Sequence, residues 1–326
     1  MYRHLLFFML AVLFGCVGPN GAPDTRPRVI FDTDMDSDID DVGALAMLHN
    51  LHKQNRISLL GVIVTSDDPF APTCASALNR HYGHGHLPIG FPENQTRLAN
   101  HSRYTRQLSE EYPHPLTSWQ TCPSATETYR RLLATSPDNA VIIITVGHLS
   151  SLQNLLQSEP DSISPLDGKS LVKNKVQKWY CMGGQFPEGK EANFYRPDPA
   201  STFYCLENWE KEVVFSGWET GQDIITGDAE LKKRLPADHP VYRGYELYNR
   251  FAGRASWDQT AVLLLVPQSM DFFEFEDNGK CIVNADGSNY WKWGEKSNHR
   301  FLKIKDGVEK SAISEVITDL MTGNSM

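Results

Sequence analysis

An acidic segment that follows a short apolar run constrains this chain more than any other part of its sequence. The run Val29-Ile30-Phe31 leads into six aspartates within ten residues, 32–41. Beyond Asp41, apolar residues recur at the spacing of an amphipathic helix. A strand, an acidic turn and a helix place the carboxylates at the carboxyl end of a strand, where open α/β sheets keep their binding sites.

The density of negative charge in this segment predicts a bound cation. Neighbouring carboxylates repel one another strongly unless a cation lies among them. Carboxylate oxygens are hard ligands, so we expect Ca²⁺, with Mg²⁺ the less favoured choice. A solvated acidic loop is the alternative, and the helix dipole explains aspartates at the first turn of the helix but not all six. An EF-hand is excluded, because neither register, starting at Asp32 or at Asp34, supplies both the turn glycine and the closing glutamate.

The spacing of the aspartates resembles the signature of the nucleoside hydrolases, which are Ca²⁺-dependent enzymes that cleave the N-glycosidic bond of ribonucleosides. Asp-Thr-Asp at 32–34 is followed by Asp-Asp at 40–41. The commoner family form has three intervening residues and this chain has five, which we interpret as a two-residue insertion that leaves the roles of Asp36 and Asp38 open. Further segments resemble the family in the same order along the chain: 59–68, 87–90, 142–147, 181–184, 191–199 and 256–258.

The resemblance implies a calcium site and a general base. Asp34, Asp41, Asp258 and the backbone carbonyl of Val146 match the positions that bind Ca²⁺ in the family. Asp34 also matches the general base, which takes the proton of the attacking water. Breaking a ribosyl C–N bond passes through an oxocarbenium-like state, so an activated water and a stabilised positive sugar are both required.

The resemblance also implies the contacts of a nucleoside or riboside substrate. Asp40 and Asn193 match the residues that hold the ribose 2′- and 3′-hydroxyls, and Glu191 matches the one that receives the 5′-hydroxyl. Trp257 stands where many relatives carry a histidine that protonates the leaving base. Tryptophan cannot supply that proton, but it can stack on a flat base; burial in the core is the alternative for this residue. Other candidate donors are the histidines of 81–86, whereas His148 is expected at the entry of a helix.

The order of strand and helix patterns predicts an α/β fold. Alternation up to about residue 220 is typical of a mostly parallel open sheet with helices on both faces. Helices are expected at 240–251, 258–266 and 311–321. Segments 272–276 and 281–284 predict a small C-terminal β-hairpin around Asp277-Asn278-Gly279. The stretch 92–120 is expected to be a long loop of the kind that often forms a lid.

Composition indicates one large domain, 27–326, behind a leader and linker, 1–26. A chain of 326 residues with 40% hydrophobic residues can bury a large core, and its net charge of −9 argues against a nucleic-acid partner. The basic start and short apolar stretch of 1–14 predict export. Leu13-Phe14-Gly15-Cys16 resembles a lipoprotein box, so the protein is expected in the periplasm, either anchored by lipid at Cys16 or cleaved nearby and free. Among the five other cysteines we expect one or two disulfides at most, with free thiols as the alternative. A homo-oligomer is left open.

Three functions remain open from the sequence. The first is Ca²⁺-dependent hydrolysis of a ribonucleoside or related riboside, favoured by the aspartate set. The second is Ca²⁺-dependent binding of a ribosyl ligand without turnover, favoured by Trp257 in place of histidine. The third is hydrolysis of another N- or O-glycoside.

Overall fold

An eight-stranded sheet organises the protein, and it forms from the apolar runs of the chain. The computed structural model describes residues 24–93 and 98–324, so most of the leader, including Cys16, lies outside the described residues. The strand order is β10-β13-β7-β5-β4-β1-β2-β3. Their bounds are β1 Arg28–Thr33, β2 Ser58–Val64, β3 Ile89–Gly90, β4 Val141–Thr145, β5 Val176–Met182, β7 Glu212–Ser216, β10 Phe273–Glu276 and β13 His299–Ile304.

Neighbouring strands of this sheet run parallel, except that β10 is antiparallel to β13. The chain builds the sheet outward from β1, first through β2 and β3 on one side and then through β4 on the other. The order therefore reverses between β1 and β4, and such a reversal opens a crevice at the carboxyl ends of the strands.

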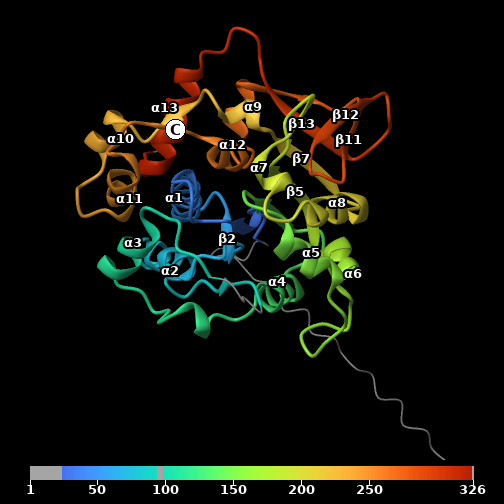
Figure 1. The fold of residues 1–326 in the computed structure, drawn as a ribbon, viewed down its shortest axis with the longest axis horizontal. Coiled ribbons are helices and arrows are strands. Elements are labelled where there is room, and N and C mark those ends of the chain that lie inside the picture. Colours follow the sequence, from blue (N-terminus) through green and yellow to red (C-terminus); the bar gives the residue numbers. More distant parts are fainter. Residues whose placement is uncertain (1–23, 94–97, 325–326) are drawn as a thin grey trace, which may run out of the picture.

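Side chains of successive strand residues enter two separate cores, one on each face of the sheet. Val29 and Phe31 belong to one core and Ile30 to the other, as the alternation of a strand requires. The first core is covered by α1 (Asp40–Lys53), α2 (Ala71–His81), α3 (Thr105–Glu111), α11 (Pro240–Asn249), α12 (Trp257–Leu263) and α13 (Lys310–Thr322). The second is covered by α4 (Ala125–Ala134), α5 (Ser150–Gln157), α6 (Gly168–Lys175) and α8 (Pro199–Asn208). Figure 1 shows the two groups on opposite sides of the sheet, which confirms the predicted fold class.

The C-terminal hairpin was predicted with the wrong partner. Strand β10 joins the edge of the large sheet beside β13, and β11 (Gly279–Val283) pairs instead with β12 (Asn289–Trp293). The hairpin turn is at 284–288, where Gly287 has φ +80° and its N–H donates to the Asn284 carbonyl. Asp277-Asn278-Gly279 is therefore not the turn of this hairpin. It connects β10, whose Phe273 is buried in the first core, to β11 in the smaller sheet.

Short elements complete the fold. They are α7 (Ala192–Tyr195), α9 (Trp218–Gly221), α10 (Ala229–Arg234), the 3₁₀ helices Trp119–Thr121 and Pro267–Asp271, β6 (Glu188–Gly189), and the pair β8 (Ile225–Thr226) and β9 (Arg254–Ala255). The stretch 92–120 is thus partly helical, contrary to the prediction of a loop throughout. The cysteines of the described chain are all free thiols, four of them buried. None of its helices is long and apolar enough to cross a membrane.

Candidate metal and substrate site

The first aspartate of the acidic segment is part of the core beneath the site. Asp32 is the next-to-last residue of β1 and is 1% exposed. Its carboxylate accepts a hydrogen bond from the Tyr129 hydroxyl at 2.6 Å and another from the Thr65 hydroxyl. Burial raises the pKa of Asp32 to about 7 against these two hydrogen bonds. The contacts tie β1 to β2 and α4, so Asp32 supports the site from below.

Three other aspartates form a compact cluster of oxygen ligands. Asp40 and Asp41 begin α1, and Asp258 lies in the first turn of α12, which packs against α1. Each offers one carboxylate oxygen, and these three atoms lie within 4.8 Å of one another. The Asp258 N–H donates to Asp40 Oδ2 at 3.3 Å, and the Thr33 hydroxyl donates to Asp41. Backbone and side chain together therefore hold the cluster in place.

The electrostatics of the cluster fit a hard divalent cation. Burial first, and then repulsion by neighbouring aspartates, raises the pKa of Asp41 and Asp258 well above the ordinary value and that of Asp40 to about 7. Asp40 Oδ1 is buried and has no hydrogen-bond partner. A buried oxygen without a donor is costly unless a ligand completes it. The donor set, all carboxylate oxygen, suits Ca²⁺ or Mg²⁺.

Asp34 and the Val146 carbonyl lie beside this cluster. The Val146 N–H donates to the Asp32 carbonyl at 2.8 Å, which aligns the ends of β4 and β1. Gly147 follows, and a Cβ there would lie 2.6 Å from the Asp34 Cβ, so only glycine permits this approach. Burial and then Asp36 raise the pKa of Asp34 well above its ordinary value. The tight trio contains Asp40 where the sequence predicted Asp34, and both line the same pocket.

The opposite side of the pocket carries two of the predicted ribose contacts, Glu191 and Asn193. Glu191 caps α7, its carboxylate accepting the Asn193 N–H at 2.8 Å and the Gly184 N–H at 3.0 Å. Burial raises the pKa of Glu191 to about 7. The Asn193 side-chain amide donates to the Val146 carbonyl at 2.8 Å. That carbonyl, predicted as a metal ligand, is thus also the anchor of the Asn193 side chain.

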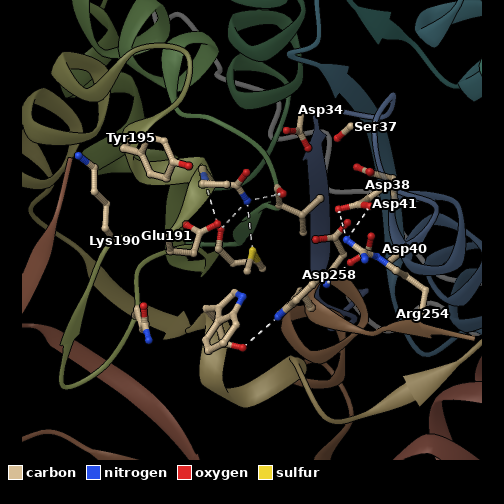
Figure 2. A pocket seen from close by; sticks show the side chains of 17 residues that line it. Asp34, Ser37, Asp38, Asp40, Asp41, Lys190, Glu191, Tyr195, Arg254 and Asp258 are labelled. Atoms are coloured by element: carbon tan, nitrogen blue, oxygen red, sulfur yellow. Dashed lines mark hydrogen bonds and ion pairs between the residues drawn. The ribbon is translucent and has the colours of Figure 1, made fainter. Parts of the chain in front are cut away.

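All eight residues predicted for the site line one pocket of about 450 Å³: Asp34, Asp40, Asp41, Val146, Glu191, Asn193, Trp257 and Asp258. Figure 2 shows Glu191 facing Asp40, Asp41 and Asp258 across it. Their assigned roles stay predictions. Sequence reasoning missed other lining residues, among them Lys190, Tyr195, Trp218 and Arg254. The only signal for Arg254 was its position three residues before Trp257.

Trp257 lines this pocket and also packs against the edge of the first core. The side chain is half-buried, and its indole N–H donates to the Trp218 carbonyl at 2.9 Å. A Cβ on Gly221 would lie 2.7 Å from its ring, so glycine is required behind it. The Arg254 guanidinium lies 4.8 Å from the ring centroid. The indole is therefore held in one orientation, with part of its surface already occupied by a cation.

The two aspartates whose roles were open bind neighbouring side chains. Asp36 accepts a hydrogen bond from the Ser66 hydroxyl at 2.6 Å. Asp38 accepts one from the Tyr248 hydroxyl at 2.7 Å and forms an ion pair with Arg254 at 2.8 Å. Asp38 thus connects the acidic segment to α11 and β9, and Asp36 connects it to the residues that follow β2.

A second pocket of about 700 Å³ adjoins the first and shares Asp34 and Asn193 with it. His101 and His148 line it. Burial lowers the pKa of His148 to about 4, and Nδ1 of His148 lies 3.0 Å from the Ser150 hydroxyl, at the start of α5 as expected. Within the described parts of the chain, none of the histidines of 81–86 lines either pocket. They gather at the far end of α1, where His84 lies 2.9 Å from His49.

Comparison with known proteins identifies the family of the chain and its fold. A family model described as inosine-uridine preferring nucleoside hydrolase matches residues 29–309. No curated protein sequence matches the chain. Among solved structures, the inosine-uridine preferring nucleoside hydrolase of Bacillus anthracis has a TM-score of 0.68 at 15% identity over 91% of this chain and 99% of that one. The plant nucleoside hydrolase PpNRh1 has a TM-score of 0.62 at 17% identity, with the same coverage.

A type III effector, XopQ, complexed with adenosine diphosphate ribose, has a TM-score of 0.65 at 12% identity over 92% of this chain and 94% of that one. Identities this low establish a shared fold, whereas the family model matches most of the sequence. The chain belongs to the inosine-uridine preferring nucleoside hydrolase family.

Proposed function

We propose that this protein hydrolyses the N-glycosidic bond of a ribonucleoside or related riboside, with Ca²⁺ bound among its aspartates. The observation that carries the proposal is the opposition of two sets of groups across one pocket. The buried oxygens of Asp40, Asp41 and Asp258 face Glu191, and Asn193 lines the same pocket. A ribose placed between them would meet acceptors for hydroxyl groups at both ends.

The metal ligands would come from Asp41, Asp258, Asp34 and the Val146 carbonyl, with Asp40 near enough to share. When bound, Ca²⁺ makes a coordinated water more acidic and neutralises the repulsion among these carboxylates. Asp34 then accepts the proton of the attacking water. Glu191 binds the 5′-hydroxyl. Asp40 and Asn193 hold the 2′- and 3′-hydroxyls, so the sugar stays in place while positive charge develops on it.

Reducing-sugar release from a panel of nucleosides and nitrophenyl riboside, with Ca²⁺ or with chelator, tests the proposal. Release that needs Ca²⁺ and is lost in Asp34→Asn supports it. If the wild-type protein releases no sugar from any member of the panel with Ca²⁺ present, hydrolysis of ribosides is refuted.

Binding without turnover is the second candidate, and two observations favour it. Trp257 occupies the position of a proton donor, and a structural neighbour is described in complex with adenosine diphosphate ribose. The adjoining pocket would leave room for more than a nucleoside. Calorimetric binding of adenosine diphosphate ribose, with no sugar released, would select this candidate.

We also propose that the protein is exported, either to the periplasm or to a membrane through lipid at Cys16. The proposal rests on the basic and apolar character of 1–14 and on the Leu-Phe-Gly-Cys segment. Cell fractionation of the wild type and of Cys16→Ser tests it. Release of the variant alone from the membrane indicates lipidation, and cytoplasmic retention of both refutes export.

A further inference from the structure

Arg254 stands in the wall of the first pocket, and the proposed hydrolysis assigns it no part. Its backbone belongs to β9, which pairs with β8 through Thr226. Its guanidinium lies 4.8 Å from the Trp257 ring centroid and 2.8 Å from the Asp38 carboxylate. Figure 2 shows it beside Asp38 and Asp40, at the opposite end of the pocket from Glu191.

The arginine is positioned before any substrate arrives. Asp38, its partner, is itself held by two hydroxyls: Tyr248 donates to its carboxylate at 2.7 Å, and Tyr104 donates to its backbone carbonyl at 2.5 Å. The side chains of Arg254 and Asp38 are 33% and 34% exposed, so the pair keeps an open side. A guanidinium has five N–H donors, and the ion pair does not use all of them.

The orientation of the sugar brings the leaving group to this arginine. With the 5′-hydroxyl at Glu191 and the 2′-hydroxyl at Asp40, C1′ of the ribose lies at the Asp40 end of the pocket. The group attached to C1′ then emerges beside Arg254 and Trp257. In this orientation the guanidinium is a fixed positive charge next to the bond that breaks.

From this geometry, and on the basis of the proposed hydrolysis, we infer that Arg254 is a catalytic residue that contacts the aglycone and stabilises the negative charge it gains on leaving. The oxygen of water forms the new bond to C1′, and its proton passes to Asp34. The bond from C1′ to the aglycone breaks, and its electron pair departs with the aglycone as an anion. Arg254 donates hydrogen bonds to that anion, which later takes a proton from solvent.

The inference names a class of aglycone. An arginine donates hydrogen bonds and accepts none, and charge-assisted bonds to an anionic oxygen are its strongest. Aglycones that leave as anions with charge on oxygen, such as phenolates or the oxo bases uracil and hypoxanthine, meet this requirement best. Cytosine and adenine carry an amino group at the position where uracil and hypoxanthine carry an oxo group, so they offer the guanidinium fewer acceptors. Asp38 acts through Arg254 and is a positioning residue.

The test measures kcat/KM for a series of substituted phenyl ribosides in wild type, R254Q and R254K. Removing a preorganised donor to a developing anion typically costs about 10²-fold or more. We expect R254Q to lose about 10²-fold on phenyl riboside and much less on 4-nitrophenyl riboside, because nitrophenolate delocalises its own charge. R254K keeps the positive charge, so its kcat/KM on phenyl riboside should lie between the values for wild type and R254Q. Uridine should be hydrolysed faster than cytidine by the wild type, and this preference should shrink in R254Q.

Arg106 provides a matched control, because it also lies over an aromatic ring, Phe70, and pairs with a carboxylate, Glu110, but lines neither pocket. R106Q should retain the wild-type profile and melting temperature. Asp38→Asn leaves the arginine in place without its charged partner, and it should show the same graded loss in weaker form even if R254Q does not fold.

A loss in R254Q that is equal for all leaving groups, or absent, overturns the inference while leaving hydrolysis intact. A loss in Asp38→Asn that is equal for all leaving groups overturns the positioning role of Asp38. Failure of the wild type to cleave any riboside overturns the inference together with the proposed function.

Discussion

Asp40→Asn should make the metal-free protein more stable, by an amount that grows with pH. Burial, followed by repulsion from Asp38, raises the pKa of Asp40 from 3.8 to about 7 in the folded chain. The folded state therefore holds this proton more tightly than the unfolded state does. The stability that this bound proton contributes is fully present below the pKa of the unfolded state, 3.8. It is lost as the pH rises through the pKa of the folded state, about 7.

The magnitude follows from the two pKa values. One pKa unit corresponds to about 1.4 kcal/mol. Relative to low pH, where Asp40 is protonated in both states, its raised pKa lowers the free energy of unfolding of the metal-free protein by about 4 kcal/mol near pH 8 and by roughly 2 kcal/mol near pH 5. Asparagine does not titrate, and its amide oxygen can still accept the Asp258 N–H. The stability advantage of the variant should therefore increase by roughly 2–3 kcal/mol between these two pH values. In a domain of this size that corresponds to roughly 3–5 °C in melting temperature.

Thermal or urea unfolding in chelator, at both pH values, provides the assay. Asp306 is exposed after β13, so Asp306→Asn serves as the control and should show no such growth. Ca²⁺ at about 100 times its Kd should restore about 2.7 kcal/mol to the wild type. Equal pH slopes for wild type and Asp40→Asn in chelator would refute the reasoning, because Asp40 would then ionise as freely in the folded chain as in the unfolded one.

The acidic segment could be understood from sequence because its information is local. A strand, an acidic turn and a helix lie within residues 28–53, and their order alone places Asp40 and Asp41 at the edge of a sheet. The fold class follows from the same local patterns repeated along the chain. What spacing does not provide is the direction of each side chain at the start of α1, and so the compact trio includes Asp40 where Asp34 was expected.

Contacts between distant segments account for what the sequence did not predict. Asp38 and Arg254 are 216 residues apart, and Asp38 and Tyr248 are 210 residues apart. No periodicity reports such pairs, so the contacts of Asp38 could not be predicted from the sequence. The misassigned hairpin has the same origin: the segment 273–276 does form a strand, but β13 outcompetes β11 as its partner.

Three further outcomes are expected. Asp34→Asn should lose about 10²–10⁴-fold in turnover yet keep its stabilisation by Ca²⁺, since the amide can still ligate through oxygen; nearly full sugar release would place the base elsewhere. His49 has its pKa lowered to about 3 by burial and then by His84, so its contribution to stability is lost as pH falls below about 6.5, and melting curves should show His49→Gln losing less stability on acidification than the wild type. Trp257→Ala should fold, because the side chain is half-buried, but it should bind aromatic aglycones more weakly by about 1–3 kcal/mol, whereas Trp257→Phe should keep most of that binding. Trp257→His should raise hydrolysis of inosine, whose base gains most from a proton donor, more than that of nitrophenyl riboside, which needs none; calorimetric affinity and sugar release separate these effects. A folded alanine variant with unaltered affinity and unaltered substrate preference would exclude Trp257 from the aglycone site and with it the stacking role.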